Sequence, residues 1–171
     1  ANITDFTTEQ TFDRIISIEM FEHLSNYQLL FEKLNSWLNS KGFIFIHIFG
    51  HKHISYPFLN NKSTDWMARH FFSGGIMPSE SLLTYFENDL LIANKWRVNG
   101  IHYQKTANAW LKNLLLKKNE LLTLFSDTYG PSQLNQKWSG WTVFFIACAE
   151  LFGFNKGHDY MVFHYLLRKK I

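Results

Sequence analysis

The sequence predicts an α/β fold built around a parallel sheet, and three neighbouring segments carry that prediction. Residues 12–18 form a short apolar run rich in β-branched side chains, which is typical of a buried strand. A helical pattern opens at Ser25-Asn26 and closes at Lys41-Gly42, where the glycine suits a helix end. Residues 42–50 form a second apolar run. A strand, a helix and a strand joined by short connections make up the unit from which parallel sheets are built.

The rest of the chain is predicted to extend this unit with a lid, a helical insert and two more strands. Residues 51–78 show no clean period and many aromatic side chains, so we expect a lid over the sheet. We then expect a short helix at 78–86, a strand at 90–98, helices at 106–129 and 132–152, a turn at 155–157 and a strand at 159–167. The predicted organisation of residues 1–171 is a core (1–50), a lid (51–78), a helix and strand (79–105), a helical cap insert (106–157) and a last strand (158–171).

Composition limits the classes of partner and compartment. The net charge is +3 and the basic residues are scattered, so we expect no nucleic-acid partner. The single cysteine, Cys148, excludes an internal disulfide, and no segment resembles a signal peptide, so we predict a reducing, cytoplasmic location. The most apolar run, 141–154, is shorter than the roughly 20 residues of a membrane span, and we expect no transmembrane segment.

One expected feature of a nucleotide-binding sheet is missing from the sequence. Such sheets normally begin with a strand and a glycine-rich turn that cradles the cofactor. No GxGxxG-like turn occurs here, and Gly74-Gly75 lies late, in the irregular stretch. Either the fold never had this turn, or the chain begins in mid-domain.

A polar cluster follows the first predicted strand and is the main candidate for chemistry. Glu19 lies three residues before Glu22 and four before His23, so one helical turn would place them on one side. Ligands of open α/β sheets bind outside the carboxyl ends of the strands. A site that moves protons or orients an amine is one interpretation. A solvated helix start, where acidic residues are favoured, is the other.

Three further histidines are candidate site residues. His47 lies near the carboxyl end of the second predicted strand, where a core histidine is the commoner outcome but a functional role is open. His51 and His53 form an HxH pattern without a convincing set of further ligands, so we predict a solvated loop and no metal site.

Several motifs together resemble a known family. The segment 12–23, FDRIISIEMFEH, followed by Asn26-Tyr27, is similar to the corresponding segment of the coclaurine N-methyltransferases, which belong to a larger group that includes the cyclopropane-fatty-acid synthases. The similarity continues in order through nearly the whole chain, at residues 45–49, 65–67, 71–75, 77–79, 98–100, 102–103, 110–111, 128–130, 144–147 and 149–152.

The resemblance implies the later half of a Rossmann-like class I methyltransferase sheet (strands 4–7) with a helical substrate cap, and S-adenosylmethionine as cofactor. It implies that Glu19 and His23 hold the substrate amine or accept its proton and that Glu22 supports them. Cyclopropane synthases resemble SVGMFEH at 17–23 and lack the carboxylate of Glu19. The resemblance also implies two sets of binding residues. The substrate set is His47, Phe72, Tyr103, Trp141 and Phe144, and the cofactor set is Asn2, Ile3, Ser17 and Ile18.

Three functions stay open at this point. The first is N-methylation of a small aromatic or alkaloid-like amine. The second is a lipid-modifying relative, because Glu22, His47 and Tyr103 match positions that bind bicarbonate in cyclopropane synthases. The third is a non-catalytic half that binds a partner. The resemblance predicts that this partner is the N-terminal, glycine-turn-bearing half of the same domain, and it leaves a homodimer open.

Overall fold

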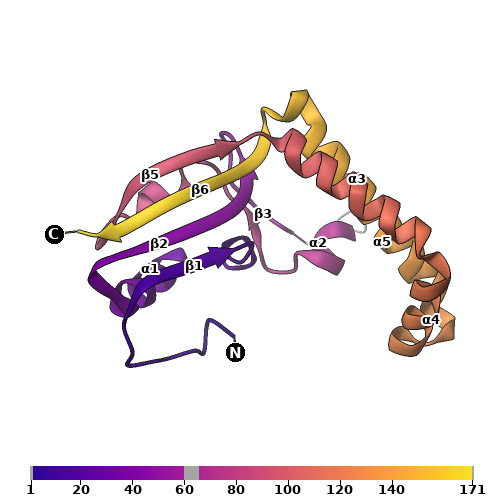
Figure 1. The fold of residues 1–171 in the computed structure, drawn as a ribbon, viewed down its shortest axis with the longest axis horizontal. Coiled ribbons are helices and arrows are strands. Elements are labelled where there is room, and N and C mark those ends of the chain that lie inside the picture. The colour runs from indigo at the N-terminus through magenta and orange to yellow at the C-terminus, as the bar shows by residue number, and fades with distance from the viewer. Residues whose placement is uncertain (1, 60–65, 171) are drawn as a thin grey trace. The chain divides into compact units, whose positions relative to one another are not determined.

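The computed structural model describes residues 2–59 and 66–170. The chain divides into two units, one formed by Ala1–Val98 with Val162–Ile171 and the other by Asn99–Met161. The first unit carries the sheet and the second is helical (Figure 1). No helix within the described residues is long and apolar enough to cross a membrane.

The sheet unit is built on four strands, and the predicted strands are found within a few residues of their expected bounds. β1 (Phe12–Ile18), β2 (Leu38–His51), β6 (Tyr160–Lys169) and β5 (Leu90–Val98) lie in the order β1-β2-β6-β5. β1 and β2 are parallel, with Ile18 opposite His47, and β5 and β6 are antiparallel (Figure 1). The carboxyl ends of β1 and β2 therefore lie at one edge, where the predicted polar cluster follows β1.

Helix α1 (Tyr27–Trp37) connects β1 to β2 and buries one apolar face. Its N-terminus is capped as expected, because the Asn26 side chain accepts a hydrogen bond from the Leu29 N–H at 3.0 Å. The predicted helix end at Lys41-Gly42 is wrong, since Leu38 already adopts an extended conformation and pairs with Phe12. Gly42 instead lies inside β2, where a Cβ atom would come within 2.7 Å of the Leu38 side chain.

The segment between β2 and β5 contains short elements. β3 (Tyr56–Pro57) pairs with β4 (Ile76–Met77), and α2 (Trp66–Phe71) lies between them in sequence. Asp65, the first residue of the 65–67 motif, lies outside the described residues. The predicted helix at 78–86 is reduced to a 3₁₀ helix, η2 (Leu82–Phe86). The reason is that His51 donates a backbone hydrogen bond to Pro78 and accepts one from Glu80, which pairs Ser79 with His51 in an isolated β-bridge and keeps this stretch out of a helix.

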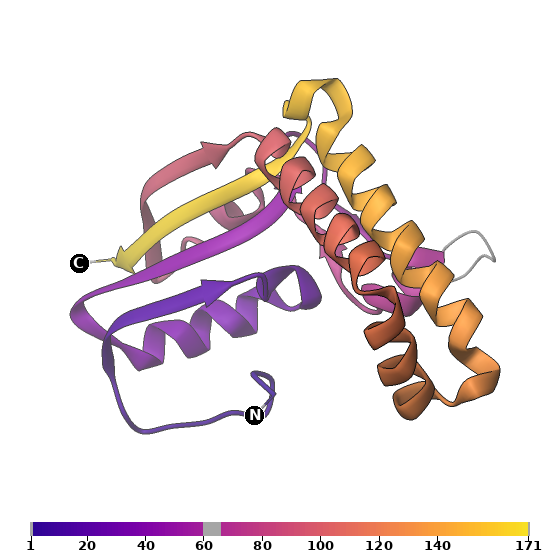
Figure 2. The same ribbon diagram turned by 45° about the vertical axis from the view of Figure 1, so that its right-hand side comes forward.

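The helical unit contains α3 (Gly100–Leu116), α4 (Lys118–Tyr129) and α5 (Leu134–Gly153), with short 3₁₀ turns η3 (Pro131–Gln133) and η4 (Phe154–Gly157). Figure 2 shows α3 and α5 packed side by side. The predicted single helix at 106–129 is wrong. It starts earlier, where Asn99 caps the N–H of Ile101, and it breaks at Lys117, whose backbone is not helical. Cys148 on α5 is half-buried, and burial raises the pKa of its thiol to about 11.

Glu80 is a buried carboxylate that the sequence analysis missed, and it bonds to residues of both β5 and β6. The Glu80 side chain is 8% exposed and receives hydrogen bonds of 2.7 Å from two nitrogens of Arg97, while Lys95 Nζ lies 2.9 Å away. Its backbone carbonyl accepts a hydrogen bond from the Tyr165 hydroxyl at 2.7 Å. Burial favours the neutral acid, but the bonds from Arg97 and Lys95 outweigh it and lower the pKa of Glu80.

We expect Glu80→Gln to lower the free energy of unfolding by about 1–2 kcal/mol at pH 7, a discounted value because Arg97 and Lys95 regain water when released. Since the folded-state pKa is lowered, this stabilisation is present above the unfolded value of about 4.3 and is lost as pH falls through the folded value. Urea unfolding at pH 7 and pH 3 measures it, with the exposed Glu9→Gln as control. Equal stabilities of the two variants at pH 7 would contradict the prediction.

Candidate functional site

The site begins at the residue that directly follows β1. Glu19 has a φ of +50°, a left-handed conformation that is uncommon and costly for a residue with a side chain. Its backbone N–H donates a 3.0 Å hydrogen bond to the carbonyl of His47, which continues the pairing of β1 with β2 by one residue. The chain then turns sharply into a short 3₁₀ helix. Such strained backbone is often found at functional sites, and no local sequence pattern indicates it here.

That 3₁₀ helix, η1 (Phe21–His23), is held from several sides. Phe21 is fully buried, and its ring packs 5.8 Å from that of Tyr27. The Tyr27 hydroxyl donates a 2.9 Å hydrogen bond to the Phe21 carbonyl. Gly75, in the segment between β3 and β5, lies so close that a Cβ atom there would collide with the Glu22 carbonyl. The positions of Glu22 and His23 are therefore set by packing and not by a solvated helix start.

Glu22 is a fully buried carboxyl beside a second carboxyl. Burial, reinforced by the negative charge of Glu19, raises the pKa of Glu22 to about 8. Glu22 therefore holds a proton at neutral pH, and the pair carries a single negative charge. Because two interacting carboxyls titrate together, that charge belongs to the pair, with Glu19 as its more exposed member at 29% side-chain exposure.

Two histidines continue this cluster across the sheet. His47 Nε2 lies 3.1 Å from Glu19 Oε1, and His47 Nδ1 lies 2.9 Å from Nε2 of His164 on β6. Burial lowers the pKa of His47, and burial together with His47 lowers that of His164, so both rings are neutral at pH 7. The sequence analysis predicted His47 as a site residue but missed His164. A lone histidine within the apolar run of β6 was the available signal.

Aromatic side chains flank the acidic cluster. The rings of His23 and Phe72 are stacked, with centroids 5.9 Å apart and an interplanar angle of 11°. Phe72 also lies 5.8 Å from Phe49 and 5.0 Å from Phe58. The sheet unit thus brings five predicted site residues together: Glu19, Glu22, His23, His47 and Phe72.

The predicted cofactor residues show features that fit a bound polar group. Ile3 and His23 help to line a cavity of about 250 Å³ with residues of the loop before α1 and of α1 itself. Lys33 of α1, which the sequence analysis missed, anchors the 2–6 loop through hydrogen bonds to the carbonyls of Ile3, Thr4 and Phe6 at 3.2, 2.6 and 3.3 Å.

The other three predicted cofactor residues differ in the groups that they could present to a ligand. The Ser17 hydroxyl is buried without a hydrogen-bond partner among the described residues, and Ile18 is 62% exposed at the end of β1. Asn2 uses its side-chain oxygen locally, because that oxygen accepts a 3.1 Å bond from the Thr4 N–H. An orphaned hydroxyl at a strand end commonly marks a place where a ligand completes the bonding.

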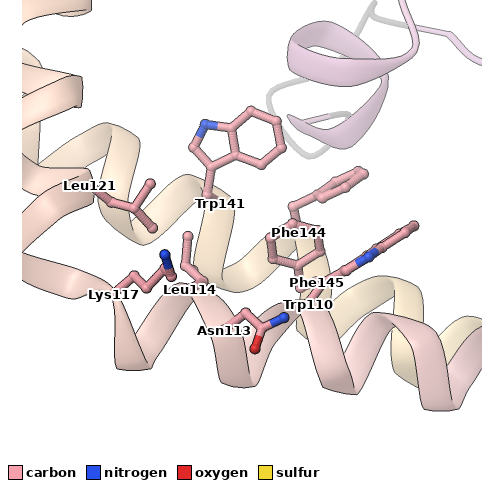
Figure 3. Close-up of a pocket in the computed structure, with 8 residues that line it drawn as sticks. All are labelled: Trp110, Asn113, Leu114, Lys117, Leu121, Trp141, Phe144 and Phe145. Carbon is pink, nitrogen blue, oxygen red and sulfur yellow. The ribbon is translucent and has the colours of Figure 1, made fainter.

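The remaining predicted substrate residues belong to the helical unit. Trp141 and Phe144 of α5 line an apolar cavity of about 510 Å³ (Figure 3). The sequence analysis missed the other lining residues, which come from α3, α4, α5 and, for Lys117, the junction between α3 and α4: Trp110, Asn113, Leu114, Lys117, Leu121 and Phe145. Tyr103 is not among them. Its ring packs instead against Phe152 at 4.3 Å and Trp110 at 6.0 Å.

Comparison with known proteins places this chain among methyltransferases and cyclopropane synthases. It is 33% identical over 175 residues to (S)-coclaurine N-methyltransferase of Papaver somniferum, which covers 99% of this chain and 49% of the relative. It is 32% identical over 172 residues to pavine N-methyltransferase of Thalictrum flavum subsp. glaucum, covering 99% and 48%.

The crystal structure of coclaurine N-methyltransferase bound to N-methylheliamine and SAH matches with a TM-score of 0.91 and 32% identity, over 99% of this chain and 50% of that one. The match confirms the predicted α/β, class I methyltransferase fold. The chain spans about half the length of the curated relatives it matches. A family model described as mycolic acid cyclopropane synthetase matches residues 1–160, and the chain therefore belongs to that family.

Proposed function

We propose that this chain is the acceptor-side part of an S-adenosylmethionine-dependent N-methyltransferase acting on a small aromatic or alkaloid-like amine. The similar proteins are N-methyltransferases, which supports this reaction class. The observation that carries the proposal is the Glu19 carboxylate at the carboxyl edge of β1, 3.1 Å from His47 and beside the protonated Glu22. The negative charge at this edge attracts a protonated amine, and the Glu19 carboxylate then accepts the proton of the amine.

S-adenosylmethionine, when bound, supplies an electrophilic methyl group on a positively charged sulfur. The amine must reach that group unprotonated and in line, because its lone pair forms the new N–C bond while the old C–S electron pair leaves with the sulfur. Glu19 and His23 are the groups proposed to remove the amine proton. The ring of Phe72, stacked on that of His23, helps to hold His23 in place.

The aromatic side chains have a second proposed role. A ring face attracts a cationic amine, so Phe72 of the sheet unit suits the binding of an aromatic amine. Within the helical unit, Trp141 and Phe144 independently offer ring faces of the same kind. The cavity lined by Trp141 and Phe144 is apolar and of a size that small ligands occupy. On the cofactor side, the 2–3 loop, the unpartnered Ser17 hydroxyl and Ile18 are the residues proposed to contact S-adenosylmethionine.

A lipid-modifying activity is the second candidate, supported by the description of the family model. It would use Glu22, His47 and Tyr103 to bind bicarbonate. The surroundings of His47 argue against this, because Glu19 and His164 already lie within 3.1 Å of its two ring nitrogens. An anion at His47 would also approach the charge shared by Glu19 and Glu22. We therefore favour the amine.

The test joins this chain to the N-terminal half of a relative, because the chain spans about half the length of the relatives that it matches. The chain is co-expressed with the N-terminal half of the Papaver somniferum enzyme, and methyl transfer is assayed with heliamine and with dioleoylphosphatidylcholine vesicles, which contain no methylatable amine. Transfer to heliamine supports the proposal, and transfer to the vesicles replaces it with the lipid activity. Transfer to neither, with a stable complex of the two halves, supports the non-catalytic alternative.

Calorimetry with S-adenosylmethionine measures the affinity of the isolated chain for this cofactor. We expect binding at least about tenfold weaker than that of the reconstituted protein, because the glycine-rich turn normally supplies the backbone N–H groups for the cofactor. Equally tight binding by the isolated chain would contradict this. The cytoplasmic location and a homodimer stay predictions.

A further inference from the structure

A run of polar contacts crosses from β6 to the end of β1 through the middle of the sheet unit. His164 on β6 lies 2.9 Å from His47 Nδ1 on β2, and His47 Nε2 lies 3.1 Å from Glu19 Oε1. The two histidine rings also lie together, with centroids 4.9 Å apart, and the His164 ring packs 5.2 Å from Phe45. The contact joins residues 117 positions apart in the sequence.

The chemistry of these groups sets the direction of donation. An ionised carboxylate can only accept, so Glu19 repels a lone pair on His47 Nε2 and attracts an N–H there. In a neutral imidazole one nitrogen carries hydrogen and the other a lone pair, so His47 Nδ1 must accept. His164 Nε2 is then the donor. The order of donation is from His164 to His47, and the His47 nitrogen that carries the hydrogen, Nε2, lies 3.1 Å from Glu19 Oε1.

We propose that His164 is a positioning residue, which fixes His47 in its neutral Nε2–H form and so preserves the net negative charge of the Glu19–Glu22 pair that faces the substrate amine. The part that concerns the amine rests on the proposed function. The part that concerns the tautomer of His47 rests only on the contacts of His164, His47 and Glu19.

The physical consequence is that His164 protects the negative charge of the site. A hydrogen bond donated to Nδ1 stabilises neutral His47, because a protonated Nδ1 would face another donor. Without it, His47 can take up a proton and form a full ion pair with Glu19. That pair would cancel the charge that attracts the amine. The titratable groups around His47 are Glu19 after β1, Glu22 in η1 and His164 on β6, and the carboxylates favour this protonation.

Nuclear magnetic resonance of ¹⁵N-histidine-labelled protein of 171 residues reports the tautomer and the pKa of His47. The measurement compares wild type with the variants His164→Phe and His164→Gln. Phenylalanine keeps the ring that packs on Phe45 but cannot donate, whereas glutamine can still donate through its amide. We expect wild-type His47 to be protonated on Nε2 only. We expect the pKa of His47 to rise by about one unit in His164→Phe and to stay near wild type in His164→Gln.

An Nδ1–H form of His47 in the wild-type protein would overturn the proposal without any variant, so a folding failure of His164→Phe leaves it testable. Equal titration of His47 in all three proteins would overturn it too. In the reconstituted enzyme, we expect the acidic limb of the pH–rate profile of His164→Phe to move up by the same amount. A confirmed tautomer with no methylation of heliamine would reject the proposed function and keep the positioning role.

Discussion

Replacing Glu19 with glutamine is expected to lower the turnover of amine methylation at least about 100-fold in the reconstituted enzyme, within the range that a positioned proton acceptor contributes. Glutamine has nearly the same shape but neither the charge nor the basicity of a carboxylate. The Kd for S-adenosylmethionine should change by less than about threefold, because the predicted cofactor residues are others. Single-turnover kinetics and calorimetry measure the two quantities.

The backbone at Glu19 calls for one additional variant. Its φ of +50° suits glycine better than any residue with a Cβ atom, so Glu19→Gly removes the carboxylate and relieves strain at once. We expect this variant to be inactive although it is at least as stable as wild type, which separates loss of chemistry from loss of fold. The exposed Glu9→Gln is the matched control and should keep wild-type turnover.

His23→Ala should also reduce turnover at least about tenfold, and Phe72→Leu should produce a smaller loss, since Phe72 acts by stacking on His23. Unchanged turnover in both Glu19→Gln and His23→Ala would reject the assigned acceptor site. It would then leave the lipid-modifying and non-catalytic alternatives.

The buried carboxyl of Glu22 is expected to make the free energy of unfolding depend strongly on pH. Its pKa is raised from 4.5 to about 8, so the folded state holds a proton that the unfolded state releases between these values. Folding is therefore favoured at low pH, and the free energy of unfolding falls as pH rises through the window from about 4.5 to 8. At about 1.4 kcal/mol per pKa unit, the loss amounts to a few kcal/mol.

Glu22→Gln removes this titration and should flatten that part of the pH dependence. Urea unfolding at pH 5, 6.5 and 8 gives the comparison, and the variant should gain stability relative to wild type as pH rises. The neutral histidines His47 and His164 titrate in the opposite sense, so the difference between variant and wild type isolates Glu22. A constant difference across the three pH values would contradict the raised pKa, and Glu9→Gln should keep the wild-type slope.

Local pattern was sufficient for the bounds of two strands. The apolar runs at 12–18 and 90–98 form strands with the predicted bounds. The predicted burial of 12–18 is wrong, because β1 is an edge strand of the described sheet and is exposed along most of its length. The glutamates and histidine after β1 were found because they follow such a run directly. Helix ends were less predictable. Strand pairing at Leu38 and the non-helical backbone at Lys117 override the apolar periodicity around them.

The sequence by itself therefore determined the α/β class, the strands and the acidic cluster around Glu19, since these depend on side-chain type and near spacing. Only the tertiary structure decided that Glu22 is fully buried, that Glu19 lies in a left-handed turn and that His164 reaches His47. These features come from strand pairing and packing between residues far apart in the chain. No local pattern specifies such pairing, because it depends on the order β1-β2-β6-β5 of the whole sheet.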